Sequence, residues 1–254
     1  MNYRSIWISD VHLGSRHSQT DLLIEFLRTH ECRNLYLVGD IIDGWELRRR
    51  WYWTEEANTV IQKILRKNRK RTRVTYIHGN HDEFLQGFIR VNVGGVRIVD
   101  HVIHVGVDGR RYLVIHGHQL DGLVQFNRLL ERVGSRLYDA ILVLNTYFNR
   151  IRRKMGFGYW SVASFLKQNT KSAVRYVTGF EDGMVQLARQ HDVHGVICGH
   201  IHRAEMRKVG DIDYFNCGDW VETCSALVED YQGQIQLLRL RESKAEIEGM
   251  SQWC

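Results

Sequence analysis

The chain has 254 residues, 44% of them hydrophobic and 25% charged, which predicts one large soluble α/β domain with a substantial core. Its longest unbroken aliphatic run, residues 140–144, is far too short to span a bilayer, and this excludes a transmembrane protein. The net charge of +6, with an isoelectric point near 9.1, favours an anionic partner: a phosphorylated substrate, a nucleic acid or an acidic membrane surface.

The N-terminus and the cysteines indicate the cellular compartment. No long apolar segment follows Met1, so we expect no signal peptide. The five cysteines are odd in number and irregularly spaced, which favours a reduced, cytoplasmic protein in which they act as small buried hydrophobic residues.

Short apolar runs that stop at polar clusters recur along the chain, and each predicts a buried strand that ends in a loop. Residues 6–8 end at Asp10 and His12, whose side chains an extended chain points to the same side. Four later apolar runs also end at polar clusters: residues 35–38, 74–77, 112–115 and 196–198. In the same order, the clusters are Asp40 and Asp43; Asn80, His81 and Asp82; His116 and His118; and His200 and His202. Buried carboxylates need cations or donors nearby, so we predict a polynuclear metal site at one edge of a sheet.

Two helices are predicted in the first third of the chain, at residues 20–27 and from Thr54 onward, where acidic residues follow the start. The segment between them, residues 45–53, mixes aromatic rings with arginines and includes Trp45 and Arg50. It suits two interpretations equally well. It can stack on a ring and clamp a phosphate, or it can cover the core with a solvated rim.

Residues 120–180 combine apolar residues at helical spacing with many arginines and lysines. One interpretation is a helical hairpin packed on the domain, and the other is a helical cap over the metal edge. Further on, residues 211–215, 224–229 and 235–240 alternate in polarity and turn at glycines, which predicts a β-meander. The predicted organisation is a core of residues 1–119 and 181–240, an inserted cap at residues 120–180 and a polar tail at residues 241–254.

In their order along the chain, the motifs Asp-x-His, Gly-Asp-x-x-Asp, Gly-Asn-His-Asp, a strand-end His and Gly-His-x-His resemble those of the calcineurin-like metallophosphoesterases, from Ser9 to His202. The resemblance implies a four-layer α/β/β/α sandwich with two divalent ions at one edge. It assigns the metal ligands as follows: Asp10, His12 and His202 for one ion, Asn80, His116 and His200 for the other, and Asp40 bridging the two.

The resemblance also implies that His81 faces the substrate while Asp43 hydrogen-bonds it and fixes its tautomer. Ligands of carboxylate, amide and imidazole type without thiolate suit Mn²⁺, iron or Zn²⁺, and the resemblance favours Mn²⁺. Two such ions can activate water for attack at phosphorus, and an imidazole held by a carboxylate can protonate the departing oxygen. Three further residues match no essential role in the family and are expected to support the ligands: His118, Asp82 and Asp121.

Within the family, the chain resembles the UDP-2,3-diacylglucosamine hydrolases of bacterial lipid A synthesis through Gly-Asp-x-x-x-x-Trp, Gly-Asn-x-Asp-x-Phe and Gly-His-x-His-Arg, which begin at residues 39, 79 and 199. This implies cleavage of UDP-2,3-diacylglucosamine to the lipid monophosphate and UMP, or hydrolysis of a related anionic lipid. The residues expected to contact the substrate are Trp45, Arg50, Asn169, Lys171 and Arg203.

Two departures separate the chain from those hydrolases, which commonly have Arg at the position of His81 and Asp at that of His118. The alternatives are therefore a general phosphodiesterase or phosphomonoesterase, a nuclease, which would use the positive charge, and last a non-enzymatic scaffold, because no predicted ligand is missing. Nucleic acid is the less favoured partner. The basic, apolar cap predicts transient contact with the anionic cytoplasmic face of the inner membrane.

Overall fold

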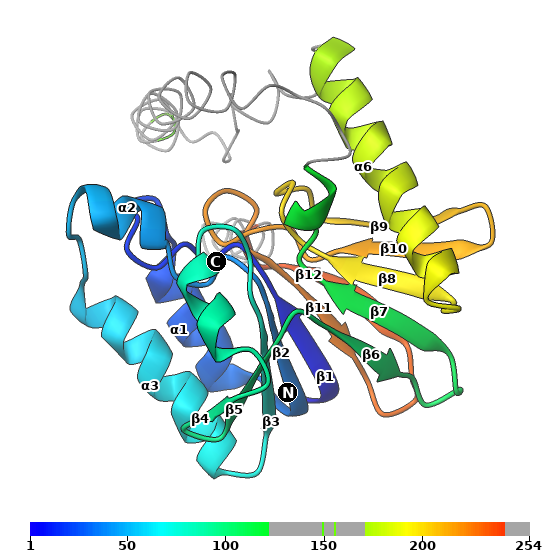
Figure 1. The fold of residues 1–254 in the computed structure, drawn as a ribbon. Coiled ribbons are helices and arrows are strands. Elements are labelled where there is room, and N and C mark those ends of the chain that lie inside the picture. Colours follow the sequence, from blue (N-terminus) through cyan, green and yellow to red (C-terminus); the bar gives the residue numbers. More distant parts are fainter. Residues whose placement is uncertain (122–148, 150–154, 156–170, 242–254) are drawn as a thin grey trace.

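The computed structural model describes residues 1–121, 149, 155 and 171–241. Their strands form two sheets that pack face to face, with helices on the outer face of each (Figure 1). The predicted four-layer α/β/β/α sandwich is therefore confirmed. No described helix is both long enough and apolar enough to cross a membrane.

The first sheet has seven strands in the order β12-β11-β1-β2-β3-β5-β4. Its four central strands are parallel, and β11, β12 and β4 run antiparallel to their neighbours at the two sides. The strands are β1 (Asn2–Ile8), β2 (Glu31–Val38), β3 (Arg73–Ile77), β4 (Asn92–Val93), β5 (Val96–Val99), β11 (Ser225–Glu229) and β12 (Ile235–Arg239).

The second sheet has five strands in the order β6-β7-β8-β10-β9. Its three middle strands are parallel, and β6 and β9 pair antiparallel at its edges. The strands are β6 (His101–Val105), β7 (Arg111–Ile115), β8 (Gly195–Cys198), β9 (Glu205–Val209) and β10 (Ile212–Asn216).

Three apolar layers hold the sandwich together. The helices α1 (Thr20–Thr29) and α3 (Glu55–Arg69) bury Phe26 and Val60 against the first sheet. Between the sheets, Trp7 stacks on Tyr36 at a ring distance of 5.4 Å. The long helix α6 (Lys171–Gln190) covers the second sheet with residues such as Phe180. Shorter helical segments lie in the loops: α2 (Gly44–Arg49), η1 (Glu83–Phe88) and η2 (His118–Leu120).

The predicted β-meander is wrong. β11 and β12 form a hairpin in the first sheet, whereas β10 belongs to the second sheet, beside β8 and β9. The chain crosses between the sheets in the buried turn after β10, where the carboxylate of Asp219 accepts the backbone N–H groups of Val221 and Thr223. Polarity alternation alone does not distinguish a strand that pairs with its sequence neighbour from one that pairs in another sheet.

Most of the predicted cap lies outside the described residues, as does the predicted tail from residue 242 on. α6 begins at Lys171 and runs through residue 180 without a break, so one helix joins the end of the predicted cap to the core. The division into core and cap stays a prediction.

Candidate metal centre

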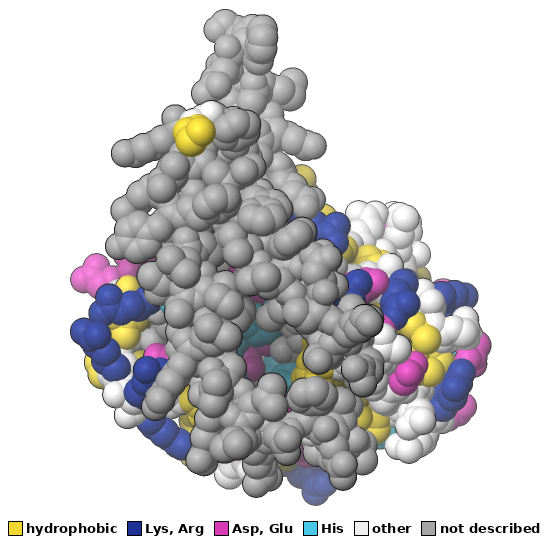
Figure 2. Space-filling model, turned by 90° about the horizontal axis from the view of Figure 1, so that it is seen from above, with side chains coloured by type: hydrophobic (Ala, Val, Ile, Leu, Met, Phe, Trp, Pro, Cys, Tyr) yellow, Lys and Arg dark blue, Asp and Glu magenta, His cyan; other side chains and the backbone are white. Residues whose placement is uncertain are grey.

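The carboxyl ends of five strands meet at one edge of the sandwich and carry every predicted metal ligand. The loops after β1 and β2 are joined by backbone hydrogen bonds, from Asp10 N to Gly39 O at 3.0 Å and from His12 N to Asp40 O at 2.9 Å. The loops after β7 and β8 are joined in the same way, from Gly199 N to His116 O at 3.1 Å. Figure 2 looks down on this edge and shows histidine and carboxylate side chains gathered near the middle of the face.

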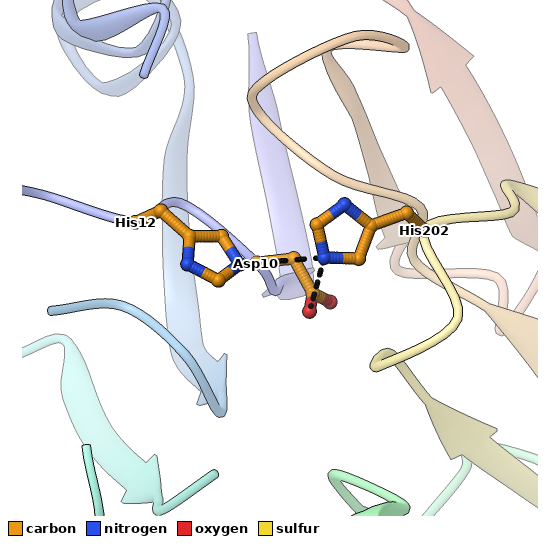
Figure 3. A group of neighbouring side chains, drawn as sticks. All are labelled: Asp10, His12 and His202. Carbon is orange, nitrogen blue, oxygen red and sulfur yellow. Dashed lines mark hydrogen bonds and ion pairs between the residues drawn. The ribbon is translucent and has the colours of Figure 1, made fainter. Parts of the chain in front are cut away.

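The first cluster consists of Asp10, His12 and His202, whose nearest ligand atoms all lie within 4.8 Å of one another. Nε2 of His202 lies 3.2 Å from Oδ1 of Asp10 and 3.3 Å from Nε2 of His12, so the two rings point at each other beside the carboxylate (Figure 3). The Nδ1 atom of His12 is hydrogen-bonded to Asp43 at 2.9 Å, so Nε2 is the ring nitrogen that is directed toward the cluster.

The second cluster consists of Asp40, His116 and His200. His116 donates its Nδ1–H to the backbone oxygen of Val38 at 2.8 Å, and its Nε2 lies 3.2 Å from Oδ2 of Asp40. Nε2 of His200 lies 2.8 Å from Oδ1 of Asp121, which leaves Nδ1 of His200 with its lone pair. A histidine held at one ring nitrogen in this way presents the other nitrogen as a metal ligand.

Buried polar atoms without hydrogen-bond partners test whether these residues suit metal ions. Within the described part of the chain, Oδ1 of Asp10, Oδ1 of Asn80 and Nε2 of His116 are buried without such a partner. Native proteins leave few polar atoms in this state. Of the nine such atoms among the described residues, these three and Nδ1 of His202 belong to predicted ligands, and the other five do not. Oxygen and imidazole ligands without thiolate suit Mn²⁺, iron or Zn²⁺. The donors therefore fit a pair of divalent ions.

Five predicted ligand residues have a strained backbone. Asp10, His12, Asp40, His200 and His202 adopt positive φ angles of 52°, 53°, 52°, 71° and 52°. Such conformations cost about 1–3 kcal/mol each and cluster at functional sites. All five residues lie in the loops that meet at this edge.

Two glycines of the motifs allow the loops to approach so closely. A Cβ atom at Gly79 would lie 2.1 Å from Oδ1 of Asp40, and one at Gly39 would lie 2.2 Å from Nδ1 of His116. Gly39 also has a φ of 79°. Any side chain at either position would displace a predicted ligand.

Buried acids and bases shift one another's pKa in the metal-free site. Burial raises the pKa of Asp10, but the charge and hydrogen bond of His202 outweigh it and lower the pKa to about 2. Burial lowers the pKa of His12, but its hydrogen bond to Asp43 and the charge of Asp40 raise it to about 9. Burial also lowers the pKa of His116, but the charge and hydrogen bond of Asp40 outweigh it and raise the pKa to about 10. Protons thus balance the buried carboxylates where metal ions would.

Asp43 holds two histidines at once. Its Oδ1 lies 3.0 Å from Nδ1 of His81, and its Oδ2 lies 2.9 Å from Nδ1 of His12. Oδ1 also accepts the backbone N–H of Glu46 at 2.9 Å and caps α2. Burial raises the pKa of Asp43, but the hydrogen bonds from the two histidines outweigh it and keep the carboxyl ionised. The predicted contact with His81 is present, and the contact with His12 was not foreseen.

His81 lies between the ligands and the surface. Its backbone N–H donates to Oδ1 of Asp40 at 2.8 Å, and its ring lies edge-on to His12 at 4.6 Å. Trp45 covers it, with ring centres 4.2 Å apart, and itself remains 47% exposed. The imidazole is therefore held at Nδ1 by Asp43 and packs between His12 and Trp45.

The structure describes two of the four remaining residues that are predicted to contact the substrate. Arg203 follows His202 directly and pairs through Nε with Glu205 at 3.0 Å. Arg50 is exposed at the end of α2. Asn169 and the side chain of Lys171 lie outside the described residues.

Two supporting residues come from the two ends of the predicted cap. Asp121 follows η2, and Tyr176 of α6 donates its hydroxyl to Oδ1 of Asp121 at 3.2 Å, the atom that holds His200. No motif in the sequence marks Tyr176. Asp82 links the loops after β2 and β3, because its Oδ2 accepts the backbone N–H of Ile41 at 2.9 Å and the hydroxyl of Tyr76 at 2.6 Å.

The chain belongs to the calcineurin-like phosphoesterases, whose family model matches residues 3–204. It is 27% identical over 246 residues to a UDP-2,3-diacylglucosamine hydrolase of Psychromonas ingrahamii, with 92% of this chain and 96% of that protein covered. It is 26% identical over 225 residues to the UDP-2,3-diacylglucosamine hydrolase of Neisseria gonorrhoeae, with coverage of 85% and 89%.

Among solved structures, a single mutant of Vps29 from Entamoeba histolytica is similar with a TM-score of 0.45, 15% identity and coverage of 92% of this chain and 97% of the other. The phosphoesterase YfcE of E. coli is similar with a TM-score of 0.44, 13% identity and coverage of 93% and 98%. The family and the clusters together define a metallophosphoesterase with a candidate dinuclear metal site.

Metal binding is expected to release protons. His12 and His116, with pKa values of about 9 and 10, hold protons at pH 7.5 in the metal-free protein, and a metal requires both rings to be neutral. Raising the pH removes this competition, so affinity for Mn²⁺ should rise between pH 6.5 and 8.5. Calorimetry in buffers of different ionisation enthalpy at pH 7.5 should show release of about two protons per fully loaded protein. An observed enthalpy that is the same in all buffers would contradict the expectation.

Replacing Asp121 should weaken one metal position. Asp121→Ala removes the acceptor of His200 Nε2–H, and loss of such an outer contact typically costs about 10–100-fold in metal affinity. The expected result, from a Mn²⁺ titration followed by electron paramagnetic resonance of the free ion, is one weakened position and one unchanged. Asp211→Ala is the control, because that exposed carboxylate pairs with Arg189 at the other end of α6. If both metal positions of Asp121→Ala bound Mn²⁺ as tightly as those of the wild type, Asp121 would have no role in supporting His200.

Proposed function

We propose that the protein hydrolyses a pyrophosphate or phosphodiester bond in an anionic nucleotide-lipid, with cleavage of UDP-2,3-diacylglucosamine to the lipid monophosphate and UMP as the favoured reaction. The observation that supports the chemistry is the convergence of two clusters of predicted ligands beside an imidazole held by Asp43. The choice of lipid is supported by relatives of that name that match this chain over nearly their whole length.

The proposed ligands are those expected from the motifs, with Asp40 shared between the two ions and Mn²⁺ as the favoured metal. When bound, two divalent ions supply an activated water and offset the charge that develops on the phosphate oxygens. The full set is Asp10, His12, Asp40, Asn80, His116, His200 and His202.

His81 is proposed as the general acid. With Nδ1 held by Asp43 at 3.0 Å, its Nε2 is the nitrogen that can face the substrate. As water attacks phosphorus and the bond from phosphorus to the leaving oxygen breaks, Nε2–H gives its proton to that oxygen. The ionised Asp43 keeps the ring oriented and stabilises its protonated form before the transfer. Trp45 shields one face of the ring from water.

A second candidate function is a general phosphodiesterase. The observation that favours it is His81 itself, because the lipid A hydrolases commonly have Arg at this position, and a guanidinium does not give up its proton. An enzyme with a true general acid can expel poor leaving groups and thus accept a wider range of esters.

The substrate is proposed to contact Trp45, Arg50 and Arg203, together with Asn169 and Lys171 of the cap at residues 120–180. The enzyme is proposed to act in the cytoplasm and to touch the anionic membrane surface transiently, where a lipid substrate resides. An excess of basic residues beside apolar ones favours such an interface.

The substrate proposal predicts release of UMP. Purified protein loaded with Mn²⁺ should convert UDP-2,3-diacylglucosamine to UMP and the lipid monophosphate, as followed by chromatography and mass spectrometry. Asp40→Asn should abolish the reaction, because it removes the charge shared by both metal positions. If no UMP forms while bis(p-nitrophenyl) phosphate is hydrolysed, the general phosphodiesterase is the correct function.

The proposed acid predicts a dependence on the leaving group. His81→Gln should lower turnover of an ester with a poor leaving group by about 10²–10⁴-fold, because a general acid typically contributes this much. Turnover of a p-nitrophenyl ester should fall much less, since p-nitrophenolate leaves without a proton. His30→Gln, at the end of α1 away from the metal edge, is the control. Equal losses on both esters would show that His81 is not the acid.

A further inference from the structure

An open cavity lies directly beside the first metal cluster. Its volume is about 580 Å³, and its walls include His202 and Arg203 from the loop after β8, Met206 of β9, and Leu237 and Arg239 of β12. The cavity thus lies where an edge strand of the second sheet approaches an edge strand of the first. Sites for small molecules usually occupy about 300–1,000 Å³.

Two guanidinium groups line this cavity and keep donors available. Arg239 gives one N–H to the backbone oxygen of Ala204 at 3.1 Å, and among the described residues no carboxylate pairs with it. Arg203 uses Nε for its pair with Glu205. Because a guanidinium carries five N–H donors, both side chains retain several for an acceptor in the cavity. The contact with Ala204 also fixes the direction in which Arg239 points.

The cavity has an apolar part as well. Met206 and Leu237 line it while they pack against the core between the sheets. A ligand that suits both parts has acceptor oxygens and a flat, weakly polar ring. A nucleoside has this combination, because its base offers a ring face and carbonyl oxygens, and its ribose offers hydroxyls. Guanidinium groups bind such oxygens in a fork and also stack on rings.

We propose that this cavity binds the nucleoside part of the nucleotide substrate while the adjoining phosphate lies at the metal centre. The proposal rests on the function proposed above and deepens it, because it assigns a place to the half of the substrate that leaves as UMP. Arg239 is then a specificity-determining residue that lies outside every metal motif. A simple phosphate ester without a base gains nothing from the cavity.

Binding to the Mn²⁺-loaded enzyme tests this assignment. Calorimetric titration with UMP should give a dissociation constant about tenfold or more higher for Arg239→Gln than for wild type, since a charge-assisted hydrogen bond is lost. Inorganic phosphate, which reaches the metal ions but has no nucleoside, should bind both proteins within about twofold. Arg239→Lys keeps the charge but loses the forked arrangement of guanidinium donors, so its binding of UMP should also be weaker than that of the wild type.

Arg28→Gln is the matched control, because it removes the same charge from an exposed ion pair with Glu25 on α1 and should leave UMP binding unchanged. Equal affinity of wild type and Arg239→Gln for UMP would overturn the proposal. So would equal weakening of UMP and inorganic phosphate, because the arginine would then act on the metal centre through its charge alone. Metal content of each variant confirms that the centre is intact.

The lipid assay separates this proposal from the proposed function. If UDP-2,3-diacylglucosamine is the substrate, Arg239→Gln should raise its KM by about the factor found for UMP, and an unchanged KM would refute binding of the substrate's nucleoside. If the lipid is not cleaved but UMP binding still depends on Arg239, the substrate is a different nucleotide and the cavity assignment holds.

Discussion

The balance of charge around three buried carboxylates governs this molecule. Asp10, Asp40 and Asp43 lie at one edge of the sandwich with almost no exposed surface. An ionised carboxylate is costly to bury unless opposite charge lies within a few ångströms. In the metal-free protein, protons on His12 and His116 supply that charge, because the neighbouring carboxylates raise the pKa of both rings. Divalent ions would supply it in the loaded enzyme, so the residues that fold the edge also prepare it for metal.

The two-sheet architecture brings these charges together. Parallel strands deliver their carboxyl ends to one side, and the face-to-face packing of the sheets sets the loops after β1, β2 and β3 opposite those after β7 and β8. The apolar layer between the sheets, centred on Trp7 and Tyr36, fixes the separation across which the ligands meet. Five of the predicted ligand residues in these loops adopt positive φ angles. The stability of the core is what maintains that local strain.

The sequence predicted the strand ends and the clusters after them because apolar runs and their terminating residues are local patterns. The sheet assignment of β10 escaped prediction because strand pairing depends on distant partners. Asp43 was expected to hold His81, but its second oxygen binds His12, and that depends on how two loops meet. Tyr176 and Arg239 belong to no motif, since α6 and β12 reach the site only through the tertiary fold.

Selectivity in such an enzyme therefore depends on the elements around the metal loops. The motif residues account for cleavage at phosphorus, and they place few constraints on what the phosphorus is attached to. Trp45 on α2, Asp121 and Tyr176 at the two ends of the predicted insertion, and Arg239 on β12 lie around the metal clusters. A chain about a quarter identical to its relatives can retain every ligand while these surroundings diverge. The substrate specificity of this protein must then be sought at those positions, because the predicted metal ligands place few constraints on the group attached to phosphorus.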